Sequence, residues 1–165
     1  MQQNRKSGQL QIRVSPSQKR AIKQQAAKAR MNMSDWILTQ LLPSPQRRFQ
    51  ALLADLAGSE SPSFAFAELL DLIGAMSGEE LELAVCEPPE VALDPYWANY
   101  VAATIEHAAA IKHAKAPGWT LDVPPLPEPH FGSSLAGLRL HLLVNSPPAF
   151  IARNLFIDAS VGDRV

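Results

Sequence analysis

Three polar side chains near the start of the chain have the residue types and the spacing to read a nucleic acid. The polar set is Gln9, Gln11 and Arg13, and it alternates with an apolar set, Leu10, Ile12 and Val14. Amide and guanidinium groups can hydrogen-bond to the edges of adenine and guanine in the major groove of DNA. A period of two places the two sets on opposite faces of a β-strand. The sequence therefore predicts a strand over residues 9–14 with a base-reading face and a buried face.

No comparable pattern predicts catalysis or metal binding. His107 and His113 are six residues apart on one expected helix, so they face different directions, and His130 and His141 have no Asp or Cys at a suitable spacing. The sequence contains no nucleophile elbow, phosphate-binding loop or dinucleotide-binding glycine motif. Its single cysteine, Cys86, is expected to be a small buried residue. We therefore expect no enzymatic activity, no catalytic residue, no metal site and no cofactor.

The charges are divided unevenly along the chain, although the net charge is only −1. Residues 1–50 contain ten Lys and Arg and one acid, whereas residues 51–165 contain five Lys and Arg and fifteen acids. This asymmetry predicts a polyanionic partner for the first part only. There is no apolar run of about 18 residues and no secretory h-region, so we expect a cytoplasmic protein without a membrane partner.

Two helices are expected to position the strand. Ser15 and Pro16 are suited to start a helix that runs to about Ala29, and Ser34 is suited to cap a second helix from Asp35 to about residue 42. A single short strand cannot form a sheet, so we expect it to pair with the same strand of a second chain as an antiparallel ribbon. The expected dimer core is Leu10, Ile12, Val14, Ile22, Trp36 and Ile37.

The motifs Ile-Arg-Val-Ser-Pro-Ser-Gln-Lys and Met-Asn-Met-Ser-Asp-Trp-Ile give residues 9–42 a resemblance to ribbon-helix-helix repressors, and among them to antitoxins. The resemblance implies that Gln9, Gln11 and Arg13 contact bases. It also implies that Asn32, Met33 and Ser34, at the start of the second helix, contact phosphate. We expect Arg5 and Lys6 of the basic arm to contact phosphate as well. Many relatives have Gly in the turn near Arg30, and this chain does not.

The remainder of the chain predicts further helices over residues 46–57, 64–75, 77–85 and 95–113, and an extended proline-rich segment over 117–129. Strands are expected over residues 138–144 and 149–158. The apolar cluster between Leu69 and Met76 packs on the 95–113 helix or, alternatively, forms a docking site for a protein. Four aromatic residues are expected to fill a core: Tyr96, Trp97, Tyr100 and Trp119.

Three segments resemble a bacterial family encoded beside nucleotidyltransferase-type toxins: Pro95-Tyr-Trp-Ala-Asn-Tyr, Pro-Pro-Leu-Pro-Glu-Pro-His-Phe-Gly132 and Arg153-Asn-Leu-Phe-Ile-Asp. The resemblance implies a cognate toxin as partner, with a nucleotidyltransferase favoured over an acetyltransferase.

Together these observations predict a mostly helical α+β protein. The expected parts are a flexible basic arm (1–8), a ribbon-helix-helix dimerisation and DNA-binding module (9–43), a helical linker region (44–90) and an α+β partner-binding domain (91–165). The favoured function is an antitoxin that binds double-stranded operator DNA as a homodimer, represses its own operon and neutralises a toxin. The alternatives are a stand-alone repressor with a ligand-sensing C-terminal domain, or an enzyme domain fused to a DNA-binding head.

Overall fold

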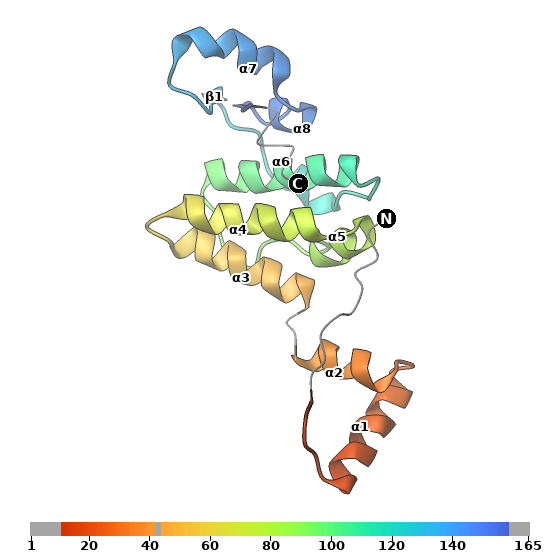
Figure 1. The fold of residues 1–165 in the computed structure, drawn as a ribbon. Helices are drawn as coiled ribbons and strands as arrows, with labels where there is room; N and C mark the ends of the chain where they lie inside the picture. The colour runs from red at the N-terminus through yellow and green to blue at the C-terminus, as the bar shows by residue number, and fades with distance from the viewer. Residues whose placement is uncertain (1–10, 42–43, 159–165) are drawn as a thin grey trace. The chain divides into compact units, whose positions relative to one another are not determined.

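The computed structural model describes residues 11–41 and 44–158 and shows a predominantly helical chain with one small two-stranded sheet (Figure 1). The predicted class, mostly helical α+β, is confirmed. The chain divides into two compact units, residues 1–43 and residues 44–165, which we call the N-terminal and C-terminal units. Each unit is described separately below.

The N-terminal unit contains two helices, α1 (Pro16–Lys28) and α2 (Met33–Leu41), which pack on each other. The predicted start of the first helix is confirmed, because the Ser15 hydroxyl accepts from the backbone N–H of Gln18 and the Gln18 side chain accepts from the N–H of Ser15. This reciprocal capping box satisfies two N–H groups that a helix terminus leaves without partners.

The predicted cap of the second helix is wrong by two residues. Ser34 lies within the first turn of α2, and the capping residue is Asn32. The Asn32 side-chain oxygen accepts from the N–H of Asp35 at 2.8 Å, and its carbonyl accepts from the N–H of Trp36 at 3.0 Å. Asparagine and serine are both favoured caps, so residue type alone did not distinguish the two positions.

The predicted strand over residues 9–14 falls partly outside the described residues, which exclude Gln9 and Leu10. Residues 11–14 are not in a strand in this single chain. A short strand needs a hydrogen-bonded neighbour, and the predicted neighbour belongs to a second chain. The intermolecular ribbon therefore stays a prediction.

Four further predicted helices of the chain are confirmed: α3 (Pro45–Gly58), α4 (Pro62–Ala75), α5 (Gly78–Ala84) and α6 (Pro95–Ile111). Three of them have a side-chain cap that accepts backbone N–H groups, from Ser44, Ser77 and Asp94. Proline occupies the first position of three of these helices, where its missing N–H costs nothing.

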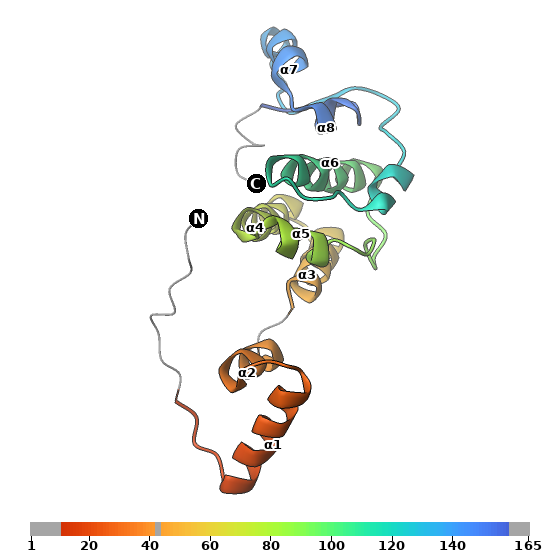
Figure 2. The same ribbon diagram turned by 90° about the vertical axis from the view of Figure 1, so that its right-hand side faces the viewer.

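These helices form layers around α6 (Figures 1 and 2). Helix α3 packs on α4 and α5, and α4 and α5 pack on α6; α8 (Pro148–Ile151) also packs on α6. The core includes Leu53 from α3, Ile73 from α4 and Ile105 from α6, all fully buried. Residues 44–90, expected as a linker region, thus share one core with the later helices.

The apolar cluster of α4 and the aromatic residues of α6 pack in the core, as predicted. The apolar cluster on α4, Leu69, Leu70, Leu72, Ile73 and Met76, is buried in the core. The aromatic side chains of α6 also pack there, with the Phe66 and Tyr100 rings edge to face at 4.6 Å between centroids. Cys86, in contrast, is exposed, and its expected burial is wrong: it follows the end of α5, and its thiol donates to the Leu83 carbonyl.

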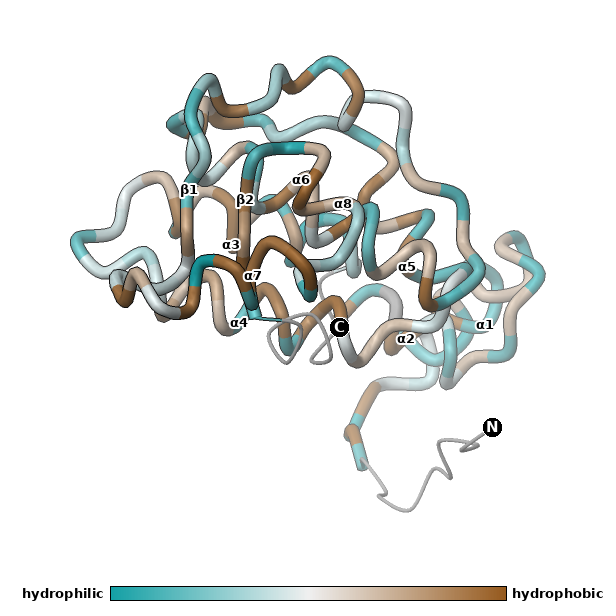
Figure 3. Tube along the Cα trace, turned by 90° about the horizontal axis from the view of Figure 1, so that it is seen from above, coloured by the Kyte–Doolittle hydropathy of each residue, from teal (hydrophilic) through white to brown (hydrophobic). Residues whose placement is uncertain are grey.

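The last part of the chain departs most from the prediction. The 117–129 segment is extended except for a 3₁₀ helix, η1 (Gly118–Asp122). It leads to β1 (His130–Phe131), which pairs in parallel with β2 (Leu155–Phe156). A second 3₁₀ helix, η2 (Ala136–Leu138), runs directly into α7 (Arg139–Asn145), which is hydrophobic along most of its length (Figure 3).

The strands predicted over residues 138–144 and 149–158 are therefore wrong, apart from the two residues of β2. Residues 138–144 comprise four Leu, one Arg, one His and one Val, and Leu and Arg favour helices. Pro148 starts α8, and Asn154 adopts a left-handed backbone with φ 58° that separates α8 from β2. Among the described residues, strand pairing in this region is limited to β1 with β2, so the remaining residues of the two predicted strands have no ladder to join.

A buried arginine fastens this last segment to α6. Arg153 is 5% exposed, and its guanidinium donates to both carboxylate oxygens of Glu106, at 2.6 and 3.2 Å. It also donates to the side chain of Asn99 and to the carbonyls of Thr120 and Val123. The network joins α6, η1 and the loop before β2, and it satisfies the charge of a guanidinium that is removed from water.

Candidate nucleic-acid interface

The N-terminal unit leaves its apolar residues largely uncovered. Of the side chains described in residues 11–41, only Ala26 is buried. Three residues predicted for a dimer core, Ile22, Trp36 and Ile37, are half-buried, and two others, Ile12 and Val14, are 53% and 42% exposed. Leu10 lies outside the described residues. A single copy of this unit therefore does not bury the apolar face that its sequence provides.

The same unit has a hollow of about 430 Å³ between its two helices. Its lining combines methionine and alanine side chains with two lysines and the capping asparagine: Lys19, Lys23, Ala26, Ala27, Met31, Asn32 and Met33. Further apolar side chains, Leu38 and Leu41, are exposed on α2. An exposed apolar surface on so small a unit indicates a site of protein association.

The polar residues beside this apolar face are accessible. Gln11 and Arg13, two of the three predicted base-reading residues, are exposed, and Gln9 lies outside the described residues. Five more cations are exposed along α1 and its C-terminal turn: Lys19, Arg20, Lys23, Lys28 and Arg30. Because residues 1–43 contain eight Lys and Arg and one acid, the unit has the electropositive character that favours binding to phosphates. Arg5 and Lys6, predicted to contact phosphates, also lie outside the described residues.

The structure brings the other predicted phosphate-binding residues together at the start of α2. Asn32 caps the helix, and Met33 and Ser34 are its first two residues, all three exposed. The N-terminus of a helix presents backbone N–H groups and a positive dipole end, which together suit a phosphate. The Asn32 side chain is engaged with Asp35, so the amides of Met33 and Ser34 are better placed than Asn32 for an anion.

The turn between α1 and α2 is made without glycine. Arg30 has φ 55°, in the left-handed region that glycine adopts most easily. The turn is held by hydrogen bonds from the backbone N–H of Arg30 to the Ala27 carbonyl and from that of Met31 to the Ala26 carbonyl. The missing Gly noted in the sequence is thus replaced by a strained arginine, whose side chain adds a cation beside the start of α2.

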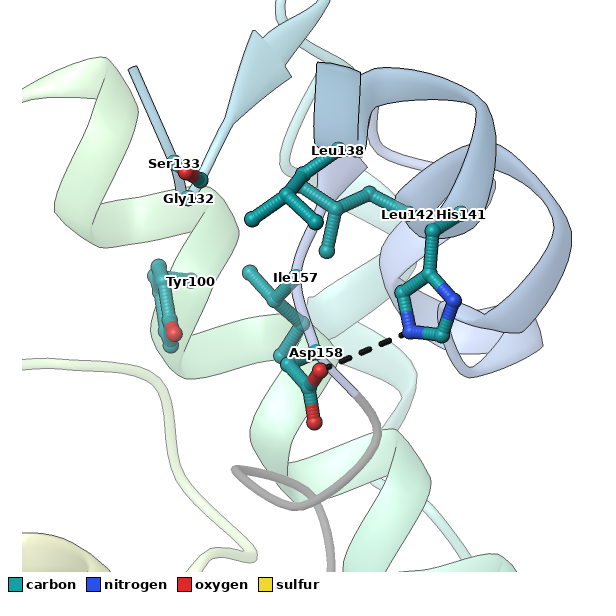
Figure 4. A pocket seen from close by; sticks show the side chains of 8 residues that line it. All are labelled: Tyr100, Gly132, Ser133, Leu138, His141, Leu142, Ile157 and Asp158. Atoms are coloured by element: carbon teal, nitrogen blue, oxygen red, sulfur yellow. Dashed lines mark ion pairs between the residues drawn. The ribbon is translucent and has the colours of Figure 1, made fainter. Parts of the chain in front are cut away.

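A second hollow, of about 290 Å³, lies in the C-terminal unit between β1, α7 and the end of β2 (Figure 4). Leu138, Leu142 and Ile157 provide apolar walls, and His141 and Asp158 form an ion pair at 3.7 Å on one side. Tyr100, from α6, also lines this hollow, and burial raises the pKa of its hydroxyl to about 12, so it is neutral at physiological pH.

This hollow does not assemble a catalytic triad. Ser133 lies on the opposite side from His141 (Figure 4), and its hydroxyl accepts from the N–H of Leu135. Among the described residues, no group of three or more His, Cys, Asp or Glu side chains could hold a metal ion. Within residues 11–41 and 44–158, no helix is both long enough and apolar enough to cross a membrane.

Comparison with known proteins gives one family for the N-terminal end of the chain. Residues 4–51 match the model of the NikA-like family, described as mobilization protein NikA, which is of the DNA-binding ribbon-helix-helix type. The match covers less than a third of the 165 residues. No curated protein and no solved structure matches the chain, and the resemblance of the C-terminal segments to a toxin-associated family has no support from these comparisons. The match supports an N-terminal DNA-binding module of the ribbon-helix-helix type.

Proposed function

We propose that this protein is a homodimeric antitoxin that binds operator DNA through its N-terminal unit and a toxin through its C-terminal unit. The observation that carries the DNA-binding part is the uncovered apolar face of the N-terminal unit. Ile12 and Val14 are exposed beside the accessible Gln11 and Arg13, in the segment that matches a ribbon-helix-helix-type family. Pairing two such segments would cover the apolar side chains and leave the polar ones outside.

The proposed ribbon presents each base-reading residue twice, because its two strands are related by two-fold symmetry. Gln9, Gln11 and Arg13 of both strands then enter the major groove, which is wide enough for a two-stranded ribbon. The amides of Met33 and Ser34 hold a phosphate at each end and fix the register without reading sequence. The operator is accordingly proposed to contain two inverted half-sites.

The proposed toxin-binding role rests on the separate core and the charge of the C-terminal unit. Residues 44–165 contain seven Lys and Arg and fifteen acids, so this unit repels DNA rather than binding it. It is proposed to act without enzymatic activity, as a body that binds a toxin, for which a nucleotidyltransferase is favoured over an acetyltransferase. The acidic unit then serves the protein partner while the basic unit serves the operator.

A second candidate function is that of an accessory protein of a DNA-transfer complex. It is favoured by the family match of residues 4–51, whose description names a mobilization protein. In that case the DNA site is a transfer origin and the partner is a DNA-processing enzyme. The stand-alone, ligand-sensing repressor has less support, because the hollow beside Tyr100 is lined partly by exposed residues.

The test combines a DNA titration with a binding assay. The full chain is titrated against the duplex upstream of its own gene, against a transfer-origin duplex from the same replicon and against random duplex of equal length. Its binding to the purified product of the adjacent gene is measured in parallel. We expect preference for the upstream duplex and a complex with the neighbour. Equal affinity for all three duplexes would exclude specific recognition, and preference for the transfer origin would favour the second candidate.

A further inference from the structure

The outward face of α7 carries three exposed apolar side chains. Leu140 and Val144 are each 72% exposed, and Leu143 is 45% exposed. Their spacing of three and four residues places them side by side on one face of the helix. Leu142 faces the opposite way and is 3% exposed. A helix that is apolar on both faces is normally buried on both, so the outward face of α7 has the composition of an interface.

Arg139 borders this stripe, because it lies one helical turn before Leu143. Its guanidinium carbon is 5.2 Å from the centroid of the Phe131 ring, and that ring stacks on Phe156 at 5.1 Å. Arg139 is exposed, and among the described residues it has no carboxylate partner. An arginine held over an aromatic ring beside exposed leucines is the kind of group that dominates binding at protein interfaces.

The charge around the stripe indicates the chemistry of the partner. Residues 129–157 contain no Asp or Glu, although the C-terminal unit has about twice as many acids as bases. A partner surface with acidic side chains is therefore attracted by Arg139, and Asp158, which directly follows this segment, is paired with His141 of α7 at 3.7 Å. A second copy of this chain fits less well, because a symmetric contact pairs the patch with itself, and residues 129–157 offer no carboxylate to meet Arg139. Nucleic acid does not fit, because the stripe itself is apolar.

We propose that Leu140, Leu143 and Val144, with Arg139 at their border, dock a protein partner that offers an apolar groove edged by Asp or Glu. The mode is a helix face lying in a groove, with anchors at positions i, i+3 and i+4. This inference rests on the proposed function, in which the C-terminal unit binds a protein. It assigns that role to α7 rather than to the apolar cluster of α4, which is buried.

The test uses the full chain and the purified product of the adjacent gene as the probe. The double variant Leu140→Glu, Val144→Glu places two charges in the stripe and is expected to weaken binding by about tenfold or more. Arg139→Glu is expected to weaken it as well, by turning an attraction for the acidic rim into a repulsion. The matched control is Leu83→Glu on the equally short helix α5, where Leu83 is 70% exposed. It is expected to leave the affinity unchanged.

Folding of each variant is checked by its thermal unfolding, which is expected to match that of the unmodified chain because the changed side chains face solvent. Affinity for DNA is measured as well and is expected to be unchanged, because the changed residues lie outside the N-terminal unit. Equal binding of the unmodified chain and the double variant to the neighbour would overturn the α7 assignment while leaving the antitoxin proposal intact. Absence of binding by the unmodified chain would overturn both. A smaller mass of the double variant alone in sedimentation would identify a second copy as the occupant and overturn the proposal.

Discussion

The two units of this chain solve the problem of burying apolar surface in opposite ways. The C-terminal unit covers its leucines, alanines and aromatic residues with its own helices, and α6 is buried along most of its length. The N-terminal unit has two helices, one buried alanine among its described side chains, and apolar residues exposed on both sides of the α1–α2 turn. The difference shows that two helices without a third layer cannot enclose a core. We therefore expect a second chain to complete this unit.

Charge follows the same division. The unit that lacks a complete core is basic, and the unit with a complete core is acidic. Association of the N-terminal units concentrates positive charge on one body, which strengthens its attraction for DNA, while the acidic units add nothing to that attraction. Dimerisation and DNA binding are thus expected to fail together, and the stability of the C-terminal unit is expected to be independent of both.

The largest effect is expected from Ile12→Pro. Proline removes a backbone donor from the middle of the proposed ribbon and should therefore abolish dimerisation and operator binding together. Light scattering should show the mass falling to that of one chain, and the thermal unfolding of the C-terminal unit should not change. Ile12→Val is the control, since it keeps both the backbone N–H and a β-branched side chain. A variant that stays dimeric would disprove the ribbon.

Arg153→Ala is expected to destabilise the C-terminal unit. It leaves the Glu106 carboxylate and the Asn99 side chain without the guanidinium that now binds them. Removing one partner of a buried ion pair costs about 3–5 kcal/mol, so the free energy of unfolding of this unit should fall by that amount. Chemical denaturation measures the change. The control is Arg139→Ala, at an exposed arginine, which is expected to change the free energy of unfolding by no more than about 0.5 kcal/mol. An equally small change for Arg153→Ala would mean that the network around Arg153 contributes little.

A smaller effect, on affinity rather than stability, is expected from Arg13→Ala. If Arg13 reads a guanine, the loss should be about 1–3 kcal/mol at one base pair of each half-site, and the preference for that base should disappear. Ser34→Asp should instead weaken binding to operator and random DNA alike, because it places a carboxylate beside the amides proposed to hold a phosphate, and phosphate contacts do not specify sequence. Both variants are compared by titration on the two duplexes. An equal loss on both duplexes for Arg13→Ala would mean that Arg13 contacts phosphate only.

The smallest effects compare the helix caps of the two units. Asn32→Ala and Ser77→Ala should each lower the stability of the unit that contains the changed residue by about 1 kcal/mol. The first should lower dimer stability and DNA affinity, and the second should lower only the unfolding free energy of the C-terminal unit.

The Ser77 cap also predicts a pH dependence. Hydrogen bonds from the Ser77 backbone and hydroxyl lower the pKa of Glu80 below 4.5. The stabilisation of the folded state by ionised Glu80 is therefore present above pH 4.5 and is lost as the pH falls through the lowered pKa. Acid titration of the unfolding free energy should show this loss in the unmodified chain and less of it in Ser77→Ala. Identical acid profiles would mean that the capping box is not maintained in solution.

Local signals in the sequence identified most helices, because caps, prolines and a 3.6-residue period act within one turn. Ser15 with Gln18 and Ser77 with Glu80 are clear examples, and each is seen in the structure. The same local reasoning placed the second cap at Ser34 instead of Asn32, since two good capping residues stood two positions apart. The residue that distinguishes them is Asp35, three positions after Asn32. Its carboxylate accepts a hydrogen bond from the Asn32 side-chain amide, and its backbone N–H donates to the Asn32 side-chain oxygen.

The errors lie where distant parts of the chain decide the outcome. A strand was predicted from Leu138 to Val144, but within the described part of the chain the short extended segment His130–Phe131 pairs with Leu155–Phe156 instead. Cys86 has the residue type of a core position, yet it follows the end of a helix and is exposed. Neither result depends on residues within a few positions, so neither could be read from them.

The sequence by itself determined the polarity of the N-terminal segment, the division of charge and the starts of most helices, because these depend on residue type and short spacing. Only the tertiary structure decided that residues 44–90 share a core with the later helices, that Arg153 points inward to Glu106, and that α7 presents leucines on its outer face. These features depend on which surfaces meet after the chain has folded. Burial and ion pairing are properties of that packing and not of any segment alone.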